Sequence, residues 1–162
     1  MARFTATTES EAIVPADRMD IWHALTDPDL LPRLTPLLRK IDADGDLWTW
    51  HMTRIAALGV SISPSFTESM SFDPGHRIQY THTPPPGARE RAGAEGWYQL
   101  SDVEGGTELR ISLSLEVDLP VPRTAAPAVH KVMEATMNRM GDRFSANLLR
   151  HLGVESESAL SA

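Results

Sequence analysis

Two long segments of this chain alternate between polar and apolar residues, which is the pattern of a β-strand with one buried face. In residues 61–72 the odd positions are serine or threonine, and the even positions hold Ile62, Pro64, Phe66, Glu68, Met70 and Phe72. Residues 108–119 repeat the pattern, with leucine, isoleucine or valine at every odd position. We therefore expect two strands of a sheet with one wet face and one apolar face.

Shorter segments between turn motifs add further strands to this sheet. The turns are predicted at Asp44-Gly45, Ala57-Leu58-Gly59, Asp73-Pro74-Gly75 and Gly105-Gly106. With the two segments above, they divide the chain into strands over residues 4–14, 38–43, 47–55, 61–72, 77–82, 95–101 and 108–119. Strands joined by such short turns form an antiparallel sheet.

The alternation gives way to a helical period after the proline pair in residues 120–122. Apolar residues then recur three or four positions apart, at Val129, Met133, Met137, Met140, Phe144 and Leu148. This spacing predicts an amphipathic helix over residues 124–152, ended by Gly153. A short helix with Asp17 as its N-cap follows the first strand, and two prolines limit a second helix within residues 30–37.

The composition narrows the function classes without naming one. With 162 residues, 41% hydrophobic and 23% charged, the chain suits one folded domain, residues 1–153, with a flexible tail over residues 154–162. The net charge of −7 argues against a nucleic-acid partner. The absence of cysteine excludes disulfides and thiolate chemistry, and no metal-binding motif is present, so we expect no metal and no cofactor.

The sequence also carries no membrane or secretion signal. The first residues lack the apolar core of a signal peptide, and no apolar run reaches the length of a membrane span. We therefore expect a cytoplasmic protein without membrane insertion. The sequence leaves its oligomeric state open.

Several short motifs resemble those of the START/SRPBCC superfamily. They are residues 13–22 (IVPADRMDIW), residues 25–28 (LTDP), residues 72–75 (FDPG), residues 105–107 (GGT) and residues 148–149 (LL). The resemblance covers essentially the whole chain. It implies an α+β helix-grip fold, in which a curved seven-stranded antiparallel sheet wraps around a long C-terminal helix, with two short helices after strand 1. The superfamily includes lipid carriers, hormone receptors, cyclases and oxygenase domains, so the resemblance implies a fold more than an activity.

In such a fold the inward residues of sheet and helix would line a cavity. The aromatic and methionine residues among them suit an apolar ligand, because thioethers adapt to irregular shapes. The leading prediction is therefore binding or transport of a small hydrophobic molecule that is lipid-, sterol- or polyketide-like. The predicted lining consists of Trp48, Trp50, Met52, Phe66, Met70, Ile78, Tyr80, Tyr98, Leu113, Met133, Met137, Met140 and Phe144. A packed interior, in a module that only contacts other proteins, is a further alternative.

Glu68 is the one charged residue on the inward face of its strand, and hairpin geometry places it opposite Trp48 and His82. A carboxylate beside an imidazole is a candidate general acid/base pair, which would suit a polyketide cyclase/aromatase- or dehydratase-like enzyme without a metal. The same row would alternatively anchor the polar end of a ligand. A structural alternative places Glu68 at the wet end of the strand, paired with a surface cation.

Two further features leave alternatives open. A two-residue turn at Gly105-Gly106 would direct Tyr98 and Leu100 inward, opposite Leu113 and Ile111, and leave Trp97 outside, whereas a three-residue turn would reverse this. The polar loop of residues 83–93 is either simply solvated or a lid near the cavity mouth.

Overall fold

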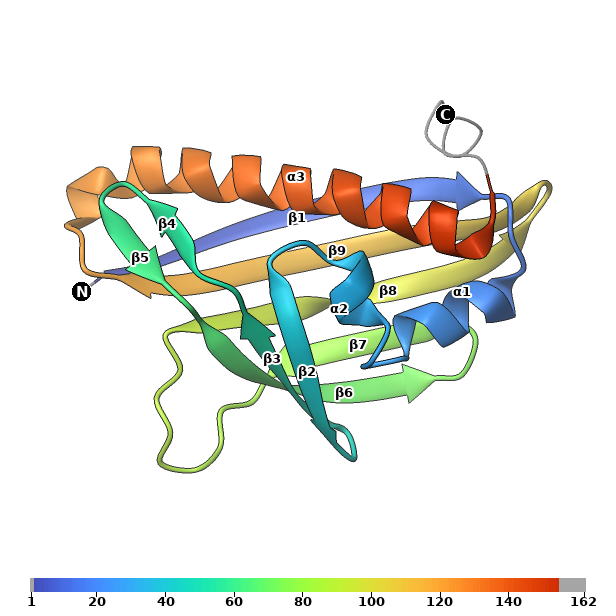
Figure 1. The fold of residues 1–162 in the computed structure, drawn as a ribbon, viewed down its shortest axis with the longest axis horizontal. Helices are drawn as coiled ribbons and strands as arrows, with labels where there is room; N and C mark the ends of the chain where they lie inside the picture. Colours follow the sequence, from blue (N-terminus) through green and yellow to red (C-terminus); the bar gives the residue numbers. More distant parts are fainter. Residues whose placement is uncertain (1, 155–162) are drawn as a thin grey trace.

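The computed structural model describes residues 2–154 and consists of an antiparallel sheet of seven strands, a two-stranded sheet and a long C-terminal helix (Figure 1). The elements are β1 (Ala2–Val14), α1 (Arg18–Leu25), α2 (Leu31–Leu34), β2 (Leu38–Asp44), β3 (Leu47–Met52), β4 (Ile55–Ala57), β5 (Val60–Ile62), β6 (Ser65–Asp73), β7 (Arg77–His82), β8 (Ala92–Val103), β9 (Gly106–Leu119), the 3₁₀ helix η1 (Arg123–Ala125) and α3 (Ala126–Leu152). Nearly all of the predicted tail lies outside the described residues.

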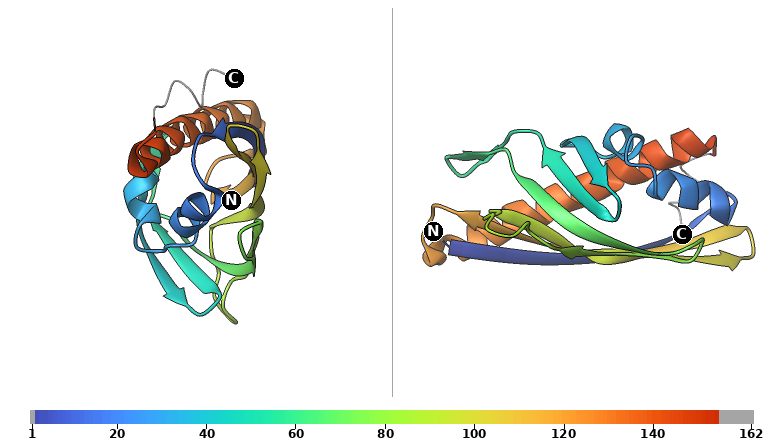
Figure 2. Two further views of the ribbon diagram at one scale, coloured as in Figure 1. Left: turned by 90° about the vertical axis from the view of Figure 1, so that its right-hand side faces the viewer. Right: turned by 90° about the horizontal axis from the view of Figure 1, so that it is seen from below.

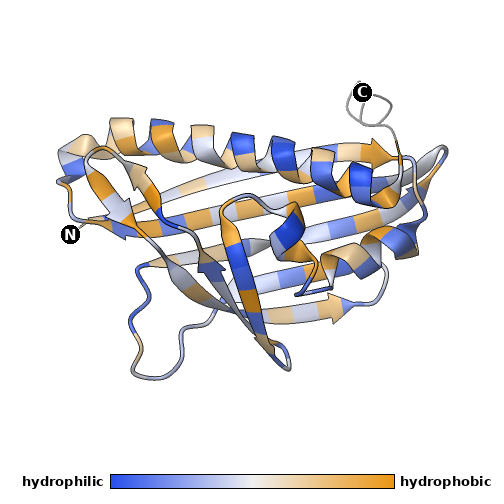
Figure 3. Cartoon of the chain, viewed as in Figure 1, coloured by the Kyte–Doolittle hydropathy of each residue, from blue (hydrophilic) through white to orange (hydrophobic). Residues whose placement is uncertain are grey.

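The large sheet curves around an interior that α3 covers. Its strand order is β1-β9-β8-β7-β6-β3-β2, and every pairing is antiparallel. Seen end-on, the sheet bends around the middle of the molecule, and α3 runs along one side of the opening (Figure 2). The hydropathy alternates from residue to residue along β9, as a strand with one solvent-exposed face requires (Figure 3). The predicted helix-grip architecture is confirmed.

The predicted strand registers in the middle of the sheet are also confirmed. Trp50 pairs with Phe66 across β3 and β6, and Glu68 pairs with both Trp48 and His82. The β6–β7 register follows from a short turn that admits few conformations and contains a glycine in the left-handed region, Gly75 with φ 78°. The β3–β6 pairs are as predicted, although the β4–β5 hairpin between these strands is offset from them by one residue.

Two predicted strands are interrupted, and this is the main correction to the predicted fold. Residues 47–55 and 61–72 were expected to be continuous, but both leave the large sheet before their shared turn, and their ends form the separate β4–β5 hairpin. The break lies at Pro64, which has no N–H to donate to the ladder and so ends the regular pairing. Only its carbonyl is used, as the acceptor of the Met52 N–H at 2.9 Å.

The helices follow the predicted pattern with small shifts. Helix α3 begins at Ala126, after a 3₁₀ turn, and ends at Gly153, whose φ of 74° allows its N–H to bond back to the carbonyls of Arg150 and Leu149. Asp17 is the N-cap of α1 as predicted, but its side chain makes no capping hydrogen bond.

The packed core lies at the end of the sheet that α1 and α2 cover. Ile21 and Leu25 of α1 and Leu31 of α2 are at most 1% exposed. The Trp22 ring meets Phe72 of β6 edge-on, with ring centroids 6.2 Å apart. A second, smaller cluster joins the start of β1 to the start of α3 through Phe4 and Val129. The space between these two packed regions holds the candidate site.

Candidate functional site

A cavity of about 510 Å³ lies between the inner face of the sheet and α3. Its walls come from the sheet, from the inward face of α3 and from the β4–β5 hairpin. The hairpin and the start of α3 lie over the same end of the sheet in Figure 1, but they are separated in the view from below (Figure 2). This volume lies within the range of sites that hold drug-sized molecules, about 300–1,000 Å³.

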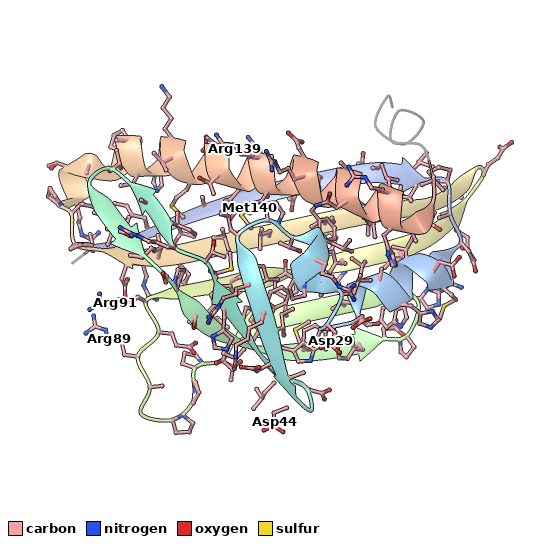
Figure 4. The ribbon with its side chains drawn as sticks, viewed as in Figure 1. Asp29, Asp44, Arg89, Arg91, Arg139 and Met140 are labelled. Carbon is pink, nitrogen blue, oxygen red and sulfur yellow. The ribbon has the colours of Figure 1, made fainter. Side chains whose placement is uncertain are left out.

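Most of the residues predicted to line a cavity border this one. These residues are Trp50, Met52, Phe66, Tyr80, Tyr98, Leu113, Met133, Met137, Met140 and Phe144. The Trp50 and Phe66 rings are stacked with centroids 6.5 Å apart, so they form a flat aromatic wall. In Figure 4, Met140 lies on the side of α3 that faces the sheet, whereas Arg139 lies on the opposite side.

The other three predicted lining residues lie in the packed core. Trp48, Met70 and Ile78 are at most 4% exposed and do not border the cavity. Trp48 packs against Phe72, with ring centroids 6.0 Å apart, beneath α1. The sequence pattern correctly predicted that these side chains point inward. It did not predict how much of the inner face of the sheet α1 and α2 would cover.

The β4–β5 hairpin supplies a wall that the sequence analysis missed. Ile55, Leu58, Val60 and Ile62 all border the cavity. Leu58 sits at the hairpin tip, 49% exposed and with a left-handed φ of 53°. The apolar residues on both sides of Gly59 were a signal for this wall, although Leu58 was assigned to the turn and Ile55 and Ile62 to the two continuous strands.

Glu68 is buried in the cavity wall. It is 1% exposed, and its Oε2 atom has no hydrogen-bond partner in the described structure. Burial raises the pKa of Glu68 well above its ordinary value, and the nearby carboxylates of Glu95 and Glu90 raise it further. The structural alternative, in which Glu68 pairs with a surface cation at the wet end of its strand, is therefore wrong.

His82 does not form the expected direct pair with Glu68. The two backbones are in register, but the His82 Nε2 atom lies 2.9 Å from an oxygen of Glu90, and Nδ1 lies 3.8 Å from Glu116. The imidazole packs against Gly93, where an added Cβ would overlap the ring. The side chain thus turns toward β8 and the loop before it, because Gly93 leaves room there and two carboxylates attract it.

Glu90 is the residue that holds this arrangement, and sequence reasoning missed it. One carboxylate oxygen accepts a hydrogen bond from the Thr67 backbone N–H at 2.8 Å, and the other accepts one from the Thr67 hydroxyl at 2.8 Å. With its contact to His82, Glu90 ties the loop of residues 83–91 to β6 and β7. No sequence signal marked it, since Glu90 stands between Arg89 and Arg91 in a segment that is typical of a solvated loop.

The polar atoms of the aromatic wall differ in how they are satisfied. The Tyr80 hydroxyl donates a hydrogen bond to the Ser112 carbonyl at 3.2 Å, whereas the Trp50 Nε1 atom is buried without a partner in the described structure. Burial raises the pKa of both Tyr80 and Tyr98, so both hydroxyls stay neutral. Trp50 and Glu68 both border the cavity, and each has one buried polar atom whose hydrogen bond is not made within the described structure.

Trp97 lies outside the cavity, which resolves the alternative at the β8–β9 turn. The turn has two residues, Glu104 and Gly105, so Tyr98 pairs with Ile111 rather than with Leu113. That shift of two positions keeps the same side chains inward. The Arg77 guanidinium lies over the Trp97 ring on the outer face, 4.8 Å from its centroid.

Two properties of the described residues, 2–154, bear on other functions. They contain no group of three or more His, Cys, Asp or Glu side chains arranged to hold a metal ion. None of their helices is both long enough and apolar enough to span a membrane.

Comparison with solved structures shows the same fold in proteins of low sequence identity. A protein from Deinococcus radiodurans is 19% identical, with a TM-score of 0.60 over 97% of this chain and 99% of its own. A START superfamily protein from Mycobacterium smegmatis is 17% identical, with a TM-score of 0.61 over 92% of this chain and 96% of its own. The di-domain ARO/CYC StfQ from the steffimycin biosynthetic pathway is 14% identical, with a TM-score of 0.65 over 93% of this chain and 51% of its own.

Family comparison gives the more specific result. A search of curated proteins gave no match. The family described as "Polyketide cyclase / dehydrase and lipid transport" matches residues 1–152, which span every strand and helix of the structure. The resemblance read from the sequence motifs is confirmed, and the chain belongs to this family.

Proposed function

We propose that the protein binds a small hydrophobic molecule, with a lipid-, sterol- or polyketide-like body, in the cavity between the sheet and α3. The observation that carries the proposal is a space of about 510 Å³ that side chains leave unfilled in the middle of the fold. Protein interiors normally close such spaces, because each void forfeits packing contacts. A family described by cyclase, dehydrase and lipid-transport members supports a ligand in this place.

The chemistry of the walls supports an apolar ligand with an irregular outline. Met133, Met137 and Met140 present flexible thioethers from α3, and Trp50 and Phe66 present flat rings from the sheet. Thioethers adjust to the shape of a ligand, while the stacked rings offer a rigid surface for it. The two unpartnered polar atoms described above would orient its polar end.

The structure gives less support to an acid/base enzyme that uses Glu68 and His82 as a pair. Both ring nitrogens of His82 lie near carboxylates other than Glu68, at 2.9 Å from Glu90 and 3.8 Å from Glu116. A proton relay between Glu68 and His82 would need a hydrogen bond, direct or through one water. We therefore place binding ahead of catalysis.

Filling the cavity should abolish binding. We expect Nile red, a neutral apolar dye, to bind the wild-type protein with one saturable site and to change its emission. A Met140→Trp substitution replaces the thioether with a bulkier indole ring in the cavity. It should weaken the dye affinity at least about 10-fold, which is roughly 1.4 kcal/mol. Fluorescence titration measures the dye affinity of each protein.

The neighbouring position supplies a matched control. Arg139 is exposed on the opposite side of α3 (Figure 4), so Arg139→Trp adds the same ring without filling the cavity and should leave the dye affinity within about twofold. Thermal unfolding of all three proteins checks that they are folded. Equal affinity for the wild type and the Met140→Trp variant would place the dye elsewhere and would contradict the proposal.

A further inference from the structure

We propose that the natural ligand is a cation: a hydrophobic molecule that carries one protonated or quaternary amine, held by the Glu68 carboxylate. This inference rests on the proposed function, because it describes the ligand of the same cavity. Its starting point is the charge of the cavity walls. Among the described residues, every charged residue of the cavity lining is acidic: Glu9, Glu11, Glu68, Glu116 and Asp142. The strand pairings place the side chains of Glu9, Glu11 and Glu116 on the outer face of the sheet, so Glu68 is the charged side chain that the sheet directs inward.

Glu68 is the acidic group that a ligand would meet inside the cavity. Its side chain is 1% exposed, borders the cavity, and leaves Oε2 without a hydrogen-bond partner in the described structure. An unpartnered buried carboxyl costs about 1–3 kcal/mol relative to a satisfied one, so a fold without a use for it would gain by replacing it. An ammonium group bound there would supply the missing charge and the missing hydrogen bonds.

The other acidic residues contribute less inside the cavity. Glu116 lies 3.3 Å from the Arg3 guanidinium, and Glu11 lies 3.6 Å from Arg110, so nearby arginines balance both carboxylates. Glu9 pairs with Ser112 on the outer face of the sheet, and Asp142 is exposed on α3. These residues add to the negative charge around the cavity, while Glu68 would hold the cation inside.

The aromatic rings around Glu68 suit a cation as well. Trp50 and Phe66 form the stacked wall next to it, and the Tyr80 and Tyr98 rings lie 5.7 Å apart across the neighbouring strands. Ring faces attract ammonium groups, most strongly where water is excluded. Aromatic walls with one buried carboxylate therefore favour a cationic head attached to an apolar body.

The same surroundings disfavour anionic ligands. Burial is the main cause of the raised pKa of Glu68, and the carboxylates of Glu95 and Glu90 raise it further, so their charges make this end of the cavity more negative. A fatty-acid carboxylate or a phosphate would enter against that field, without a basic residue among the described lining to receive it. A neutral alcohol would meet neither the repulsion nor the attraction.

Proton release should accompany the binding of the cation. Without ligand, burial and the nearby carboxylates of Glu95 and Glu90 raise the pKa of Glu68 and so favour its protonated form. The other titratable groups near it are Tyr80, Tyr98 and, across the strand pair, His82. A cation binds the ionised form, so Glu68 gives its proton to solvent. The affinity for a quaternary amine should therefore rise as the pH rises through the Glu68 pKa.

Three probes that share a ten-carbon alkyl chain but differ in the charge of the head group separate the effect of charge on binding from that of apolar contact. Displacement of Nile red at pH 8 by decyltrimethylammonium, decanol and decanoate should show the cation binding at least about 10-fold more tightly than the alcohol, as a charge-assisted contact predicts, and the carboxylate binding most weakly. Glu68→Gln should remove most of the difference between the cation and the alcohol. Asp44→Asn removes the same charge at an exposed turn (Figure 4) and should keep the difference.

Each outcome decides the inference. Equal binding of the three probes, tighter binding of decanoate, or an unchanged preference in a folded Glu68→Gln variant would overturn it while leaving the proposed function in place. If the substituted protein does not fold, the ranking of the probes on the wild-type protein still decides. Failure of every probe and of the dye to bind would instead contradict the proposed function itself.

Discussion

Replacing Glu68 with leucine should make the protein more stable at neutral pH. The carboxyl is 1% exposed and has an oxygen without a partner in the described structure, so its removal eliminates an unsatisfied buried group. We expect the free energy of unfolding to rise by about 1–3 kcal/mol, the usual cost of such a group. A residue that destabilises the resting fold in this way is best explained by a role in binding.

The increase in the free energy of unfolding that Glu68→Leu brings should become larger as the pH rises. The pKa of Glu68 is higher in the folded than in the unfolded protein, so between these two pKa values the folded state holds more protons. The contribution of Glu68 to the free energy of unfolding therefore falls as the pH rises above about 4.3, the pKa of an unperturbed glutamate. The advantage of the leucine variant should be smallest in acid and should grow toward pH 7.

Urea unfolding at pH 4, 5.5 and 7 measures this dependence. Glu104→Leu, at an exposed turn, should change stability by less than about 0.5 kcal/mol at each pH. A Glu68→Leu variant that is less stable than the wild type at neutral pH would mean that the carboxylate has a stabilising partner, against the structure described above.

Replacing Gly96 with alanine should destabilise the protein severely. A Cβ atom at this position would overlap the backbone carbonyl of Ser112 on β9 and lie 2.7 Å from the Tyr80 hydroxyl. Tyr80 crosses over Gly96 to donate its hydrogen bond to that same carbonyl, so the methyl group would displace both the ring and the strand. We expect the free energy of unfolding to fall by about 3 kcal/mol or more, which is at the upper end of the range for overpacked cores.

Gly141 provides the control for this substitution. A Cβ at Gly141, inside α3, meets no atom within 4 Å, so Gly141→Ala should stabilise the helix by up to about 1 kcal/mol. Thermal and urea unfolding compare the two variants. A Gly96→Ala protein as stable as the wild type would show that Tyr80 and β9 do not pack as described.

The strand registers were predictable because they depend on local rules. Side chains in a strand alternate with a period of two, and short turns leave few ways to pair the strands that they join. These rules turned Glu68 inward and placed it opposite Trp48 and His82, as observed. Even the two-position shift between Tyr98 and its partner left the inward face unchanged, because parity alone decides the face.

The features that the sequence did not reveal depend on side-chain competition and on packing between distant elements. His82 had several carboxylates within reach, and the choice of Glu90 required a loop conformation that no repeat or turn motif encodes. Likewise, the cavity ends where α1 and α2 cover the sheet, so Trp48 and Met70 became core residues. Pro64 indicated in the sequence that the strand pairing would be disturbed there, because proline has no N–H to donate, but the β4–β5 hairpin was not predicted from it.

The most direct test of the central claim is native mass spectrometry of the protein purified from its own host. If the cavity holds a natural hydrophobic ligand, the wild-type protein should carry one small-molecule adduct per chain. The Met140→Trp protein should lack the adduct, and the Arg139→Trp protein should retain it. A wild-type protein without an adduct, or the same adduct on the Met140→Trp protein, would contradict the claim that this cavity is the binding site.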